Sequence, residues 1–178
     1  MIVIPKTTAL KVFGAIILAT GLLTIGVLTN GSIINHVSAR SSQQFTAKLT
    51  GSNGVPPIKT PATGVAKFTL SPNGKSLSYT LNVTNINSVI GAHIHSGNAK
   101  QNGPIVLILY GNPTMTNPPT GKVNGLLSKG NTTASDLKGP LAGKQMSDLL
   151  NLIKAGSAYV NVHTTQNPKG EIRGQITS

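Results

Sequence analysis

Residues 64–83 read GVAKFTLSPNGKSLSYTLNV, and this stretch decides the fold class. Residues 64–70 alternate between small or apolar and polar side chains, as expected for a strand with one buried face. The second half places apolar side chains at every second position: Leu77, Tyr79, Leu81 and Val83. The Asn73-Gly74 pair between the two halves is typical of a tight turn, because both residue types tolerate a positive φ. The stretch therefore predicts an antiparallel β-hairpin.

Short strand-like segments separated by turn residues continue through the rest of the chain. Further strands are expected at residues 45–50, 89–95, 104–110, 123–127, 157–163 and 171–177. Loops rich in proline or asparagine are expected at 55–61 and 111–120, and one short helix at 147–156 with Ser147 as its N-cap. This spacing predicts an all-β domain, an antiparallel β-sandwich or small barrel of the immunoglobulin or superoxide dismutase kind, with one short helix.

The composition excludes several classes of enzyme. The chain has 178 residues, no cysteine and only three acidic residues, Asp136, Asp148 and Glu171. Without cysteine there is no disulfide framework, no thiolate metal site and no cysteine nucleophile. Three separated acids do not supply the carboxylate pair of a glycosidase, and no serine lies in a Gly-x-Ser-x-Gly motif. We therefore expect a binding protein and not an enzyme.

The chain is strongly basic, with 15 lysines and arginines and a net charge of +12. Only Arg40 and Arg173 are arginines, and the lysines are spread singly along the chain. Base recognition favours arginine, and single-strand binding needs aromatic platforms, which are scarce in this sequence. We therefore expect no specific nucleic-acid recognition, and instead loose association with acidic cell-surface glycans or proteins.

The first 39 residues have the pattern of an export signal or a membrane anchor. Lys6 and Lys11 precede an uncharged stretch whose most apolar part spans residues 12–28. Seventeen residues are near the lower limit for a transmembrane helix, and the lysines before them place the N-terminus in the cytoplasm. Val37-Ser38-Ala39 also offers small residues for signal cleavage after Ala39. Both outcomes place the rest of the chain outside the cell, either anchored in the cell membrane or secreted.

The expected organisation is a membrane anchor or signal at residues 1–39, a short polar linker at 40–44 and a β domain at 45–178. Three Asn-x-Ser/Thr triplets, at Asn30, Asn82 and Asn131, are potential glycosylation sites in a host that modifies exported proteins.

Three histidines form the one group of potentially metal-binding side chains in the exported part. His93 and His95 are two positions apart and therefore share one face of their strand. Asn161 and His163 repeat this spacing in a second strand, so two neighbouring strands would bring three imidazoles into one surface patch. Neutral imidazoles without thiolate or carboxylate suit one Cu(II) or Zn(II) per domain. Glu171 is expected to accept a hydrogen bond from an imidazole or to pair with Arg173, and Asn161 lies beside the patch.

A second interpretation of the same residues needs no metal. The three histidines can instead form a hydrogen-bonded polar cluster that fixes the register of the strands.

Several motifs resemble the CHRD domain, a family named after repeats in chordin and found in exported bacterial and archaeal proteins. They are GAHIHSG at 91–97, NGPIV at 102–106, AYVNVHT at 158–164 and NPKGEIRGQ at 167–175, in this order. The resemblance covers about residues 45–177 and implies an extracellular β-sandwich-like module without a defined activity. The His-x-His strand is also similar to a copper-ligand strand of copper–zinc superoxide dismutase. The chain has too few acids and histidines for that two-metal site, so dismutase activity is not expected. A copper-dependent oxidoreductase of another kind is a third alternative, ranked below a binding module and an adhesive envelope module.

Overall fold

The computed structural model describes residues 42–111 and 120–178. These residues form eight strands: β1 Gln44–Thr50, β2 Thr63–Leu70, β3 Ser76–Asn87, β4 Val89–Ser96, β5 Ile105–Tyr110, β6 Lys122–Thr133, β7 Ala158–Thr164 and β8 Ile172–Gln175. The helical elements are α1 Met146–Lys154 and three short 3₁₀ segments, η1 Gly51–Asn53, η2 Ala134–Asp136 and η3 Gly139–Leu141. The expected anchor or signal at 1–39 lies outside the described residues, as does most of the expected loop at 111–120. Within the described ranges, no helix is long and apolar enough to cross a membrane.

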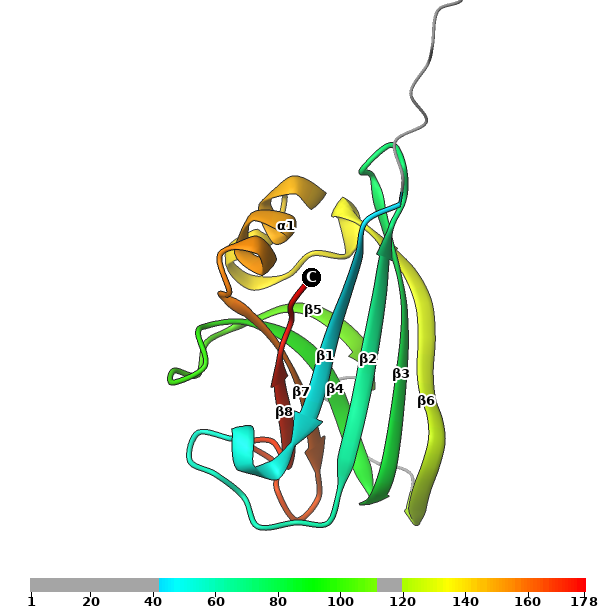
Figure 1. Ribbon diagram of the computed structural model, residues 1–178, viewed down its shortest axis with the longest axis vertical. Helices are drawn as coiled ribbons and strands as arrows, with labels where there is room; N and C mark the ends of the chain where they lie inside the picture. Colours follow the sequence, from blue (N-terminus) through cyan, green and yellow to red (C-terminus); the bar gives the residue numbers. More distant parts are fainter. Residues whose placement is uncertain (1–41, 112–119) are drawn as a thin grey trace, which may run out of the picture. The chain divides into compact units, whose positions relative to one another are not determined.

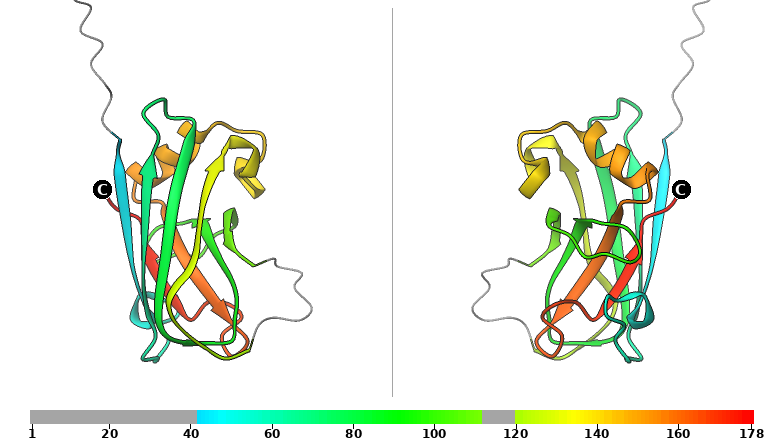
Figure 2. Two further views of the ribbon diagram at one scale, coloured as in Figure 1. Left: turned by 90° about the vertical axis from the view of Figure 1, so that its right-hand side faces the viewer. Right: turned by 90° about the vertical axis from the view of Figure 1, so that its left-hand side faces the viewer.

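All eight strands belong to one antiparallel sheet in the order β5-β4-β7-β8-β1-β2-β3-β6 (Figure 1). The sheet curls until its two edge strands, β5 and β6, approach one another (Figure 2). The carbonyl oxygen of Leu109 in β5 accepts hydrogen bonds from the hydroxyls of Tyr79 in β3 and Ser128 in β6, both at 2.7 Å. Of the two expected architectures, the structure therefore matches a nearly closed barrel.

The hairpin predicted from residues 64–83 is confirmed. Leu70 of β2 pairs with Leu77 of β3. Gly74 in the turn has φ of 71°, a left-handed conformation that glycine adopts without strain. The alternating apolar side chains of the hairpin point into the barrel, where Phe68, Leu77 and Leu81 are buried. Helix α1 covers one end of this core with a buried apolar stripe made of Met146, Leu149, Leu150 and Ile153.

Two elements differ from the sequence prediction. Strand β6 runs over twelve residues instead of 123–127, because it pairs along most of β3 although few of its side chains are buried. The length of β6 is set by backbone hydrogen bonds to β3, and the hydropathy of the side chains does not reveal these bonds. Helix α1 has Gln145 and not Ser147 as its N-cap, and the carboxylate of Asp148 accepts a hydrogen bond from the Gln145 N–H at 2.8 Å.

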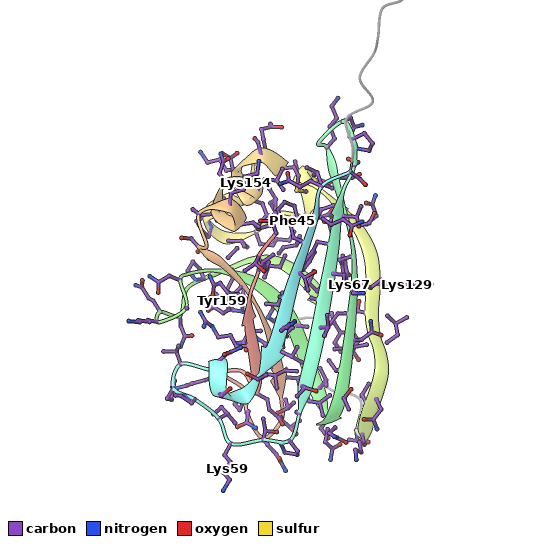
Figure 3. All side chains as sticks on the ribbon, in the orientation of Figure 1. Phe45, Lys59, Lys67, Lys129, Lys154 and Tyr159 are labelled. Carbon is purple, nitrogen blue, oxygen red and sulfur yellow. The ribbon has the colours of Figure 1, made fainter. Side chains whose placement is uncertain are left out.

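The outward face of the barrel differs between its two halves. On β2, β3 and β6, Lys67 and Lys129 are exposed to solvent and flank the half-buried Thr80 in one cross-strand row, and Figure 3 shows Lys129 pointing away from the barrel. On β4 and β7 the outward side chains are buried beneath the loops that connect the strands. All seven residues of β7 are buried, so this strand has protein on both faces.

Candidate metal site

The two histidine-bearing strands, β4 and β7, are neighbours. Their antiparallel register pairs His93 with Asn161 and His95 with Tyr159, and it places Gly91 opposite His163. The intervening Ile94, Val160 and Val162 are fully buried in the barrel core. His93, His95 and His163 therefore share the opposite face, and the predicted convergence of the three imidazoles is confirmed.

The three imidazoles are close enough to face a single ion. One ring nitrogen from each of His93, His95 and His163 can be chosen so that all lie within 4.8 Å of one another. The ring centroids are 4.9 Å apart for His93 and His163, 5.6 Å for His95 and His163 and 5.7 Å for His93 and His95. Two nitrogens bonded to one ion at about 2.0–2.1 Å are at most about 4.2 Å apart, and about 3.4 Å apart in a tetrahedral site. Shifts of less than about an ångström in the positions of the three rings would therefore bring all three nitrogens within bonding distance of one ion.

The expected surface location of this patch is wrong. The exposed fractions are 5% for His93 and 8% for both His95 and His163. The β4–β5 loop and the β7–β8 turn fold back over the outer face of the sheet and supply backbone carbonyls to the rings. Alternation along a strand predicts which side chains share a face, but it contains no information on what covers that face.

Two backbone carbonyls orient the imidazoles of His95 and His163. His95 Nδ1 lies 2.9 Å from the Gly103 oxygen, and His163 Nδ1 lies 3.0 Å from the Pro168 oxygen. A carbonyl only accepts, so each Nδ1 carries the proton and each Nε2 carries a free lone pair. Metal-binding histidines are held in the same way, with one ring nitrogen donating and the other ligating.

The remaining ring nitrogens are buried and have no hydrogen-bond partner among residues 42–111 and 120–178. They are Nδ1 and Nε2 of His93, Nε2 of His95 and Nε2 of His163. An unpaired buried polar atom costs about 1–3 kcal/mol, and natural proteins contain few of them. Four such atoms in one cluster fit a bound cation, which would accept a lone pair from each of the three rings.

The three imidazoles are neutral at pH 7. Burial, with smaller contributions from the charges of His163 and His95, lowers the pKa of His93 from 6.5 to about 3. Burial likewise lowers the pKa of His95 to about 4, against the opposing effect of its hydrogen bond to Gly103. The pKa of His163 is also lowered by burial. The rings are therefore held in the form that binds metal ions.

The two expected supporting residues have other partners. The carboxylate of Glu171 accepts hydrogen bonds from the hydroxyls of Thr60 and Thr164, both at 2.7 Å, and not from an imidazole or Arg173. Glu171 directly precedes β8, and these two threonines hold its carboxylate. Asn161 does lie beside His93 in the register, but its Nδ2 donates to the Lys169 oxygen at 3.1 Å.

Arg173 and Tyr159 support the cluster, a role that the sequence analysis did not predict for either residue. The Arg173 guanidinium carbon lies 3.8 Å from the centre of the Tyr159 ring, which stacks on His95 at 5.1 Å and 10°. Arg173 is 2% exposed and donates to four backbone carbonyls from two loops, those of Asn53, Asn98, Ala99 and Gln101. The sequence did contain a signal for this role, because Arg173 is the single arginine of the predicted β domain. If such an arginine is buried, its guanidinium needs several hydrogen-bond acceptors close by.

The β4–β5 loop borders the site and is held in place by these contacts. Besides the carbonyls that Arg173 binds, the Gly103 N–H donates to the Tyr159 hydroxyl at 3.1 Å. Gln175 Nε2 donates to the Gly97 oxygen at 2.8 Å. The loop therefore holds His95 in place.

We expect the substitution Arg173→Lys to weaken the site without removing a ligand. Lysine retains the charge but cannot bind four carbonyls in two loops or stack flat on Tyr159. The expected loss is about 3 kcal/mol in the free energy of unfolding and about tenfold in metal affinity. Denaturant titration and metal titration would measure both, and unchanged values would exclude the supporting role.

We expect Gly91→Ala to disturb His93 selectively. A Cβ at Gly91 would lie 3.0 Å from Cε1 and 3.1 Å from Nε2 of His93, so the ring would have to move by a few tenths of an ångström. The expected result is a several-fold loss of zinc affinity with a small change in stability, measured by competition with a chromophoric chelator. An unchanged affinity would show that the position of the His93 ring does not matter.

Chemically, the cluster offers three neutral nitrogen ligands and leaves one position of a tetrahedral ion for another ligand. The described acids lie elsewhere, because Asp136 and Asp148 cap helical turns and Glu171 binds two threonines.

Comparison with known proteins agrees with this architecture. The family model of the CHRD domain matches residues 45–176, which is nearly all of the part that forms the barrel. A search of curated proteins finds no match. The histidine strand, the β7 strand and the β7–β8 turn all lie within the matched region. The chain therefore belongs to the CHRD domain family.

Proposed function

We propose that this protein is an exported, membrane-anchored CHRD protein whose domain binds one Cu(II) or Zn(II) through His93, His95 and His163. The observation that carries the proposal is the buried cluster of three neutral imidazoles with ligating nitrogens within 4.8 Å of one another. No acid or thiol competes for the ion within the cluster. The protein would act as a binding module and not as a catalyst.

The unpartnered nitrogens favour this proposal over a purely structural polar cluster. A structural cluster is stabilised by hydrogen bonds between its members. Within the described part of the chain, His93 makes no hydrogen bond and no imidazole bonds to another. The carbonyl bonds of His95 and His163 orient the rings but leave both Nε2 atoms unpaired. A cation would satisfy these atoms together.

The ligand set supports copper or zinc more than other metals. Imidazole nitrogen suits both ions, and copper binds more tightly by the general order of affinities. Calcium and magnesium prefer oxygen ligands, which the cluster does not offer. The deciding experiment is a titration of the purified, chelator-treated full chain with each ion at pH 7. The proposal predicts saturation at one equivalent, and absence of stoichiometric binding would overturn it.

The anchored topology is supported by the sequence alone. Lys6 and Lys11 before the apolar residues 12–28 favour a cytoplasmic N-terminus with the β domain outside. Protease added to intact cells should then remove the domain from the cells, whereas a fully protected chain would overturn the proposal. A mature protein that starts at Arg40 would establish cleavage after Ala39 and secretion in place of anchoring.

A second candidate function is that of an adhesive module at the cell envelope. The exposed lysines of β2 and β6, Lys67 and Lys129, favour it, as does the net charge of +12. Such association with acidic glycans or proteins would be diffuse, and its affinity would fall steeply as salt is raised.

A further inference from the structure

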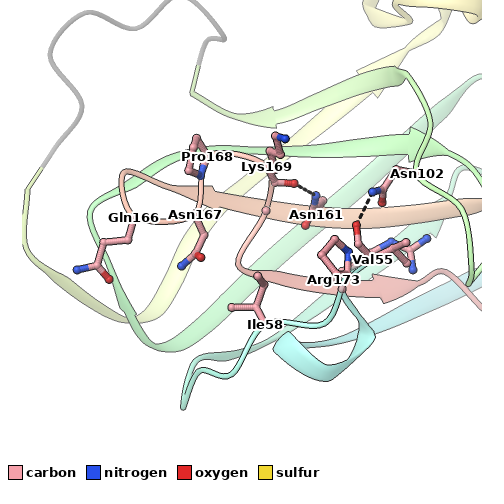
Figure 4. A pocket seen from close by; sticks show the side chains of 12 residues that line it. Val55, Ile58, Asn102, Asn161, Gln166, Asn167, Pro168, Lys169 and Arg173 are labelled. Carbon is pink, nitrogen blue, oxygen red and sulfur yellow. Dashed lines mark hydrogen bonds between the residues drawn. The ribbon is translucent and has the colours of Figure 1, made fainter.

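A preformed pocket lies beside the metal cluster without including any of its histidines. It has a volume of about 340 Å³ and lies between the β1–β2 loop and the β7–β8 turn (Figure 4). Asn161 is the residue that connects the two sites, since it lines the pocket and pairs with His93 in the sheet.

The walls of the pocket are fixed before any ligand binds. Asn102 from the β4–β5 loop donates a hydrogen bond to the Val55 carbonyl, and Arg173 Nη1 donates to the Asn53 carbonyl at 3.1 Å. On the other side, Asn161 Nδ2 holds the Lys169 carbonyl at 3.1 Å. The β4–β5 loop and strand β8 are thereby tied to the β1–β2 connection, and the β7–β8 turn is tied to strand β7. A ligand would meet a rigid site and would not have to order it.

The charge of the pocket favours an anion. Lys169 and Arg173 line it, and no acidic residue does. The nearest acid in the sequence, Glu171, is occupied by Thr60 and Thr164. The Arg173 guanidinium donates only to neutral carbonyls, and its Nε has no partner among the described residues. Among the described residues, no carboxylate therefore neutralises its positive charge at the pocket wall.

The other lining groups suit a polyhydroxylated molecule. Side-chain amides, which both donate and accept hydrogen bonds, come from Asn102, Asn161, Gln166 and Asn167. Within the described residues, the Oδ1 of Asn161 accepts no hydrogen bond. The apolar side chains of Val55, Pro56, Ile58 and Pro168 complete the lining and offer surface to the C–H face of a sugar ring. The volume is large enough for one sugar unit.

We infer that this pocket binds a carboxylate-bearing sugar, with Lys169 facing the carboxylate and the amides facing the hydroxyls. This inference does not depend on the proposed metal site. A simple carboxylate would make no hydrogen bonds to the side-chain amides. A neutral sugar would place no negative charge beside Lys169 and Arg173.

The test is titration of the metal-free full chain with D-glucuronate, D-glucose and acetate at 150 mM salt, followed by NMR or calorimetry. We expect D-glucuronate to bind with a millimolar dissociation constant, about tenfold more tightly than either control. The single-charge probes avoid the diffuse attraction that a polyanion would show. Equal binding of acetate, or no binding of D-glucuronate, would overturn the inference.

A matched pair of lysine variants separates local recognition from overall charge. Lys169→Gln is expected to weaken D-glucuronate binding about tenfold, whereas Lys59→Gln should not change it. Lys59 lies on the β1–β2 loop, does not line the pocket and points away from the barrel in Figure 3. Equal effects of the two variants would contradict a specific site. The variant His93→Leu should retain sugar binding, so failure of the metal proposal would leave this result unaffected.

Discussion

Replacement of His93 by leucine is expected to lower zinc affinity at least about a hundredfold while leaving the metal-free fold as stable as before. Neither ring nitrogen of His93 has a hydrogen-bond partner in the part of the chain that the structure describes, so an apolar side chain of similar volume loses no bond and removes two unpaired atoms. The same substitution removes one of three metal ligands. Zinc titration and denaturant unfolding of the same samples would measure both effects.

Asn161→Ala is the matched control, because Asn161 pairs with His93 in the sheet and lies on the same buried face. An amide is a poor ligand for zinc, so this variant should retain affinity within about fivefold. If the histidines were instead a hydrogen-bonded structural cluster, His93→Leu would destabilise the fold and the protein would bind no stoichiometric metal. That pair of results would reject the metal site.

Acidification is expected to unfold the metal-free protein between about pH 4 and pH 5. In the unfolded chain the histidines take up protons below about pH 6.5. In the folded chain the pKa of His93 is about 3 and that of His95 about 4, and the pKa of His163 is also lowered. The unfolded state therefore binds more protons in this window. Stability is complete above pH 6.5 and is lost as the pH falls toward the folded-state values.

Each buried neutral histidine contributes a slope of up to about 1.4 kcal/mol per pH unit. His93 and His95 together can remove about 5 kcal/mol within about two pH units, and the lowered pKa of His163 acts in the same direction. This is comparable with the 5–15 kcal/mol typical of a domain. The chain has only three acids, so few other groups compete for this effect. Denaturant unfolding at pH 7, 6, 5 and 4.5 would measure the slope, and His93→Leu should reduce it by about a third to a half. A stability independent of pH over this range would contradict the neutral, buried state of the rings.

The sequence analysis predicted those features of the fold that depend on local pattern. Alternation and the Asn73-Gly74 turn were enough to predict the β2–β3 hairpin, and the His-x-His spacing was enough to place His93 and His95 on one face. The length of β6 was not predictable in this way, because β6 is held by backbone pairing to β3 and few of its side chains are buried.

The sequence analysis predicted the three candidate metal ligands but not the loops and side chains that surround them. Its burial results from the β4–β5 loop and the β7–β8 turn, whose paths over the sheet depend on contacts distant in sequence. Arg173 is an example, since it binds carbonyls from positions 53 to 101. Glu171 was assigned to the imidazoles because it is the nearest acid in the sequence, but its actual partner Thr60 is 111 residues away.

X-ray absorption at the zinc edge of the zinc-loaded full chain tests the central claim most directly. The account predicts one zinc per chain with three imidazole nitrogens at about 2.0–2.1 Å, and loss of this signal in His93→Leu. A spectrum with fewer than two imidazoles per zinc, or an identical spectrum from His93→Leu, would contradict a site formed by His93, His95 and His163.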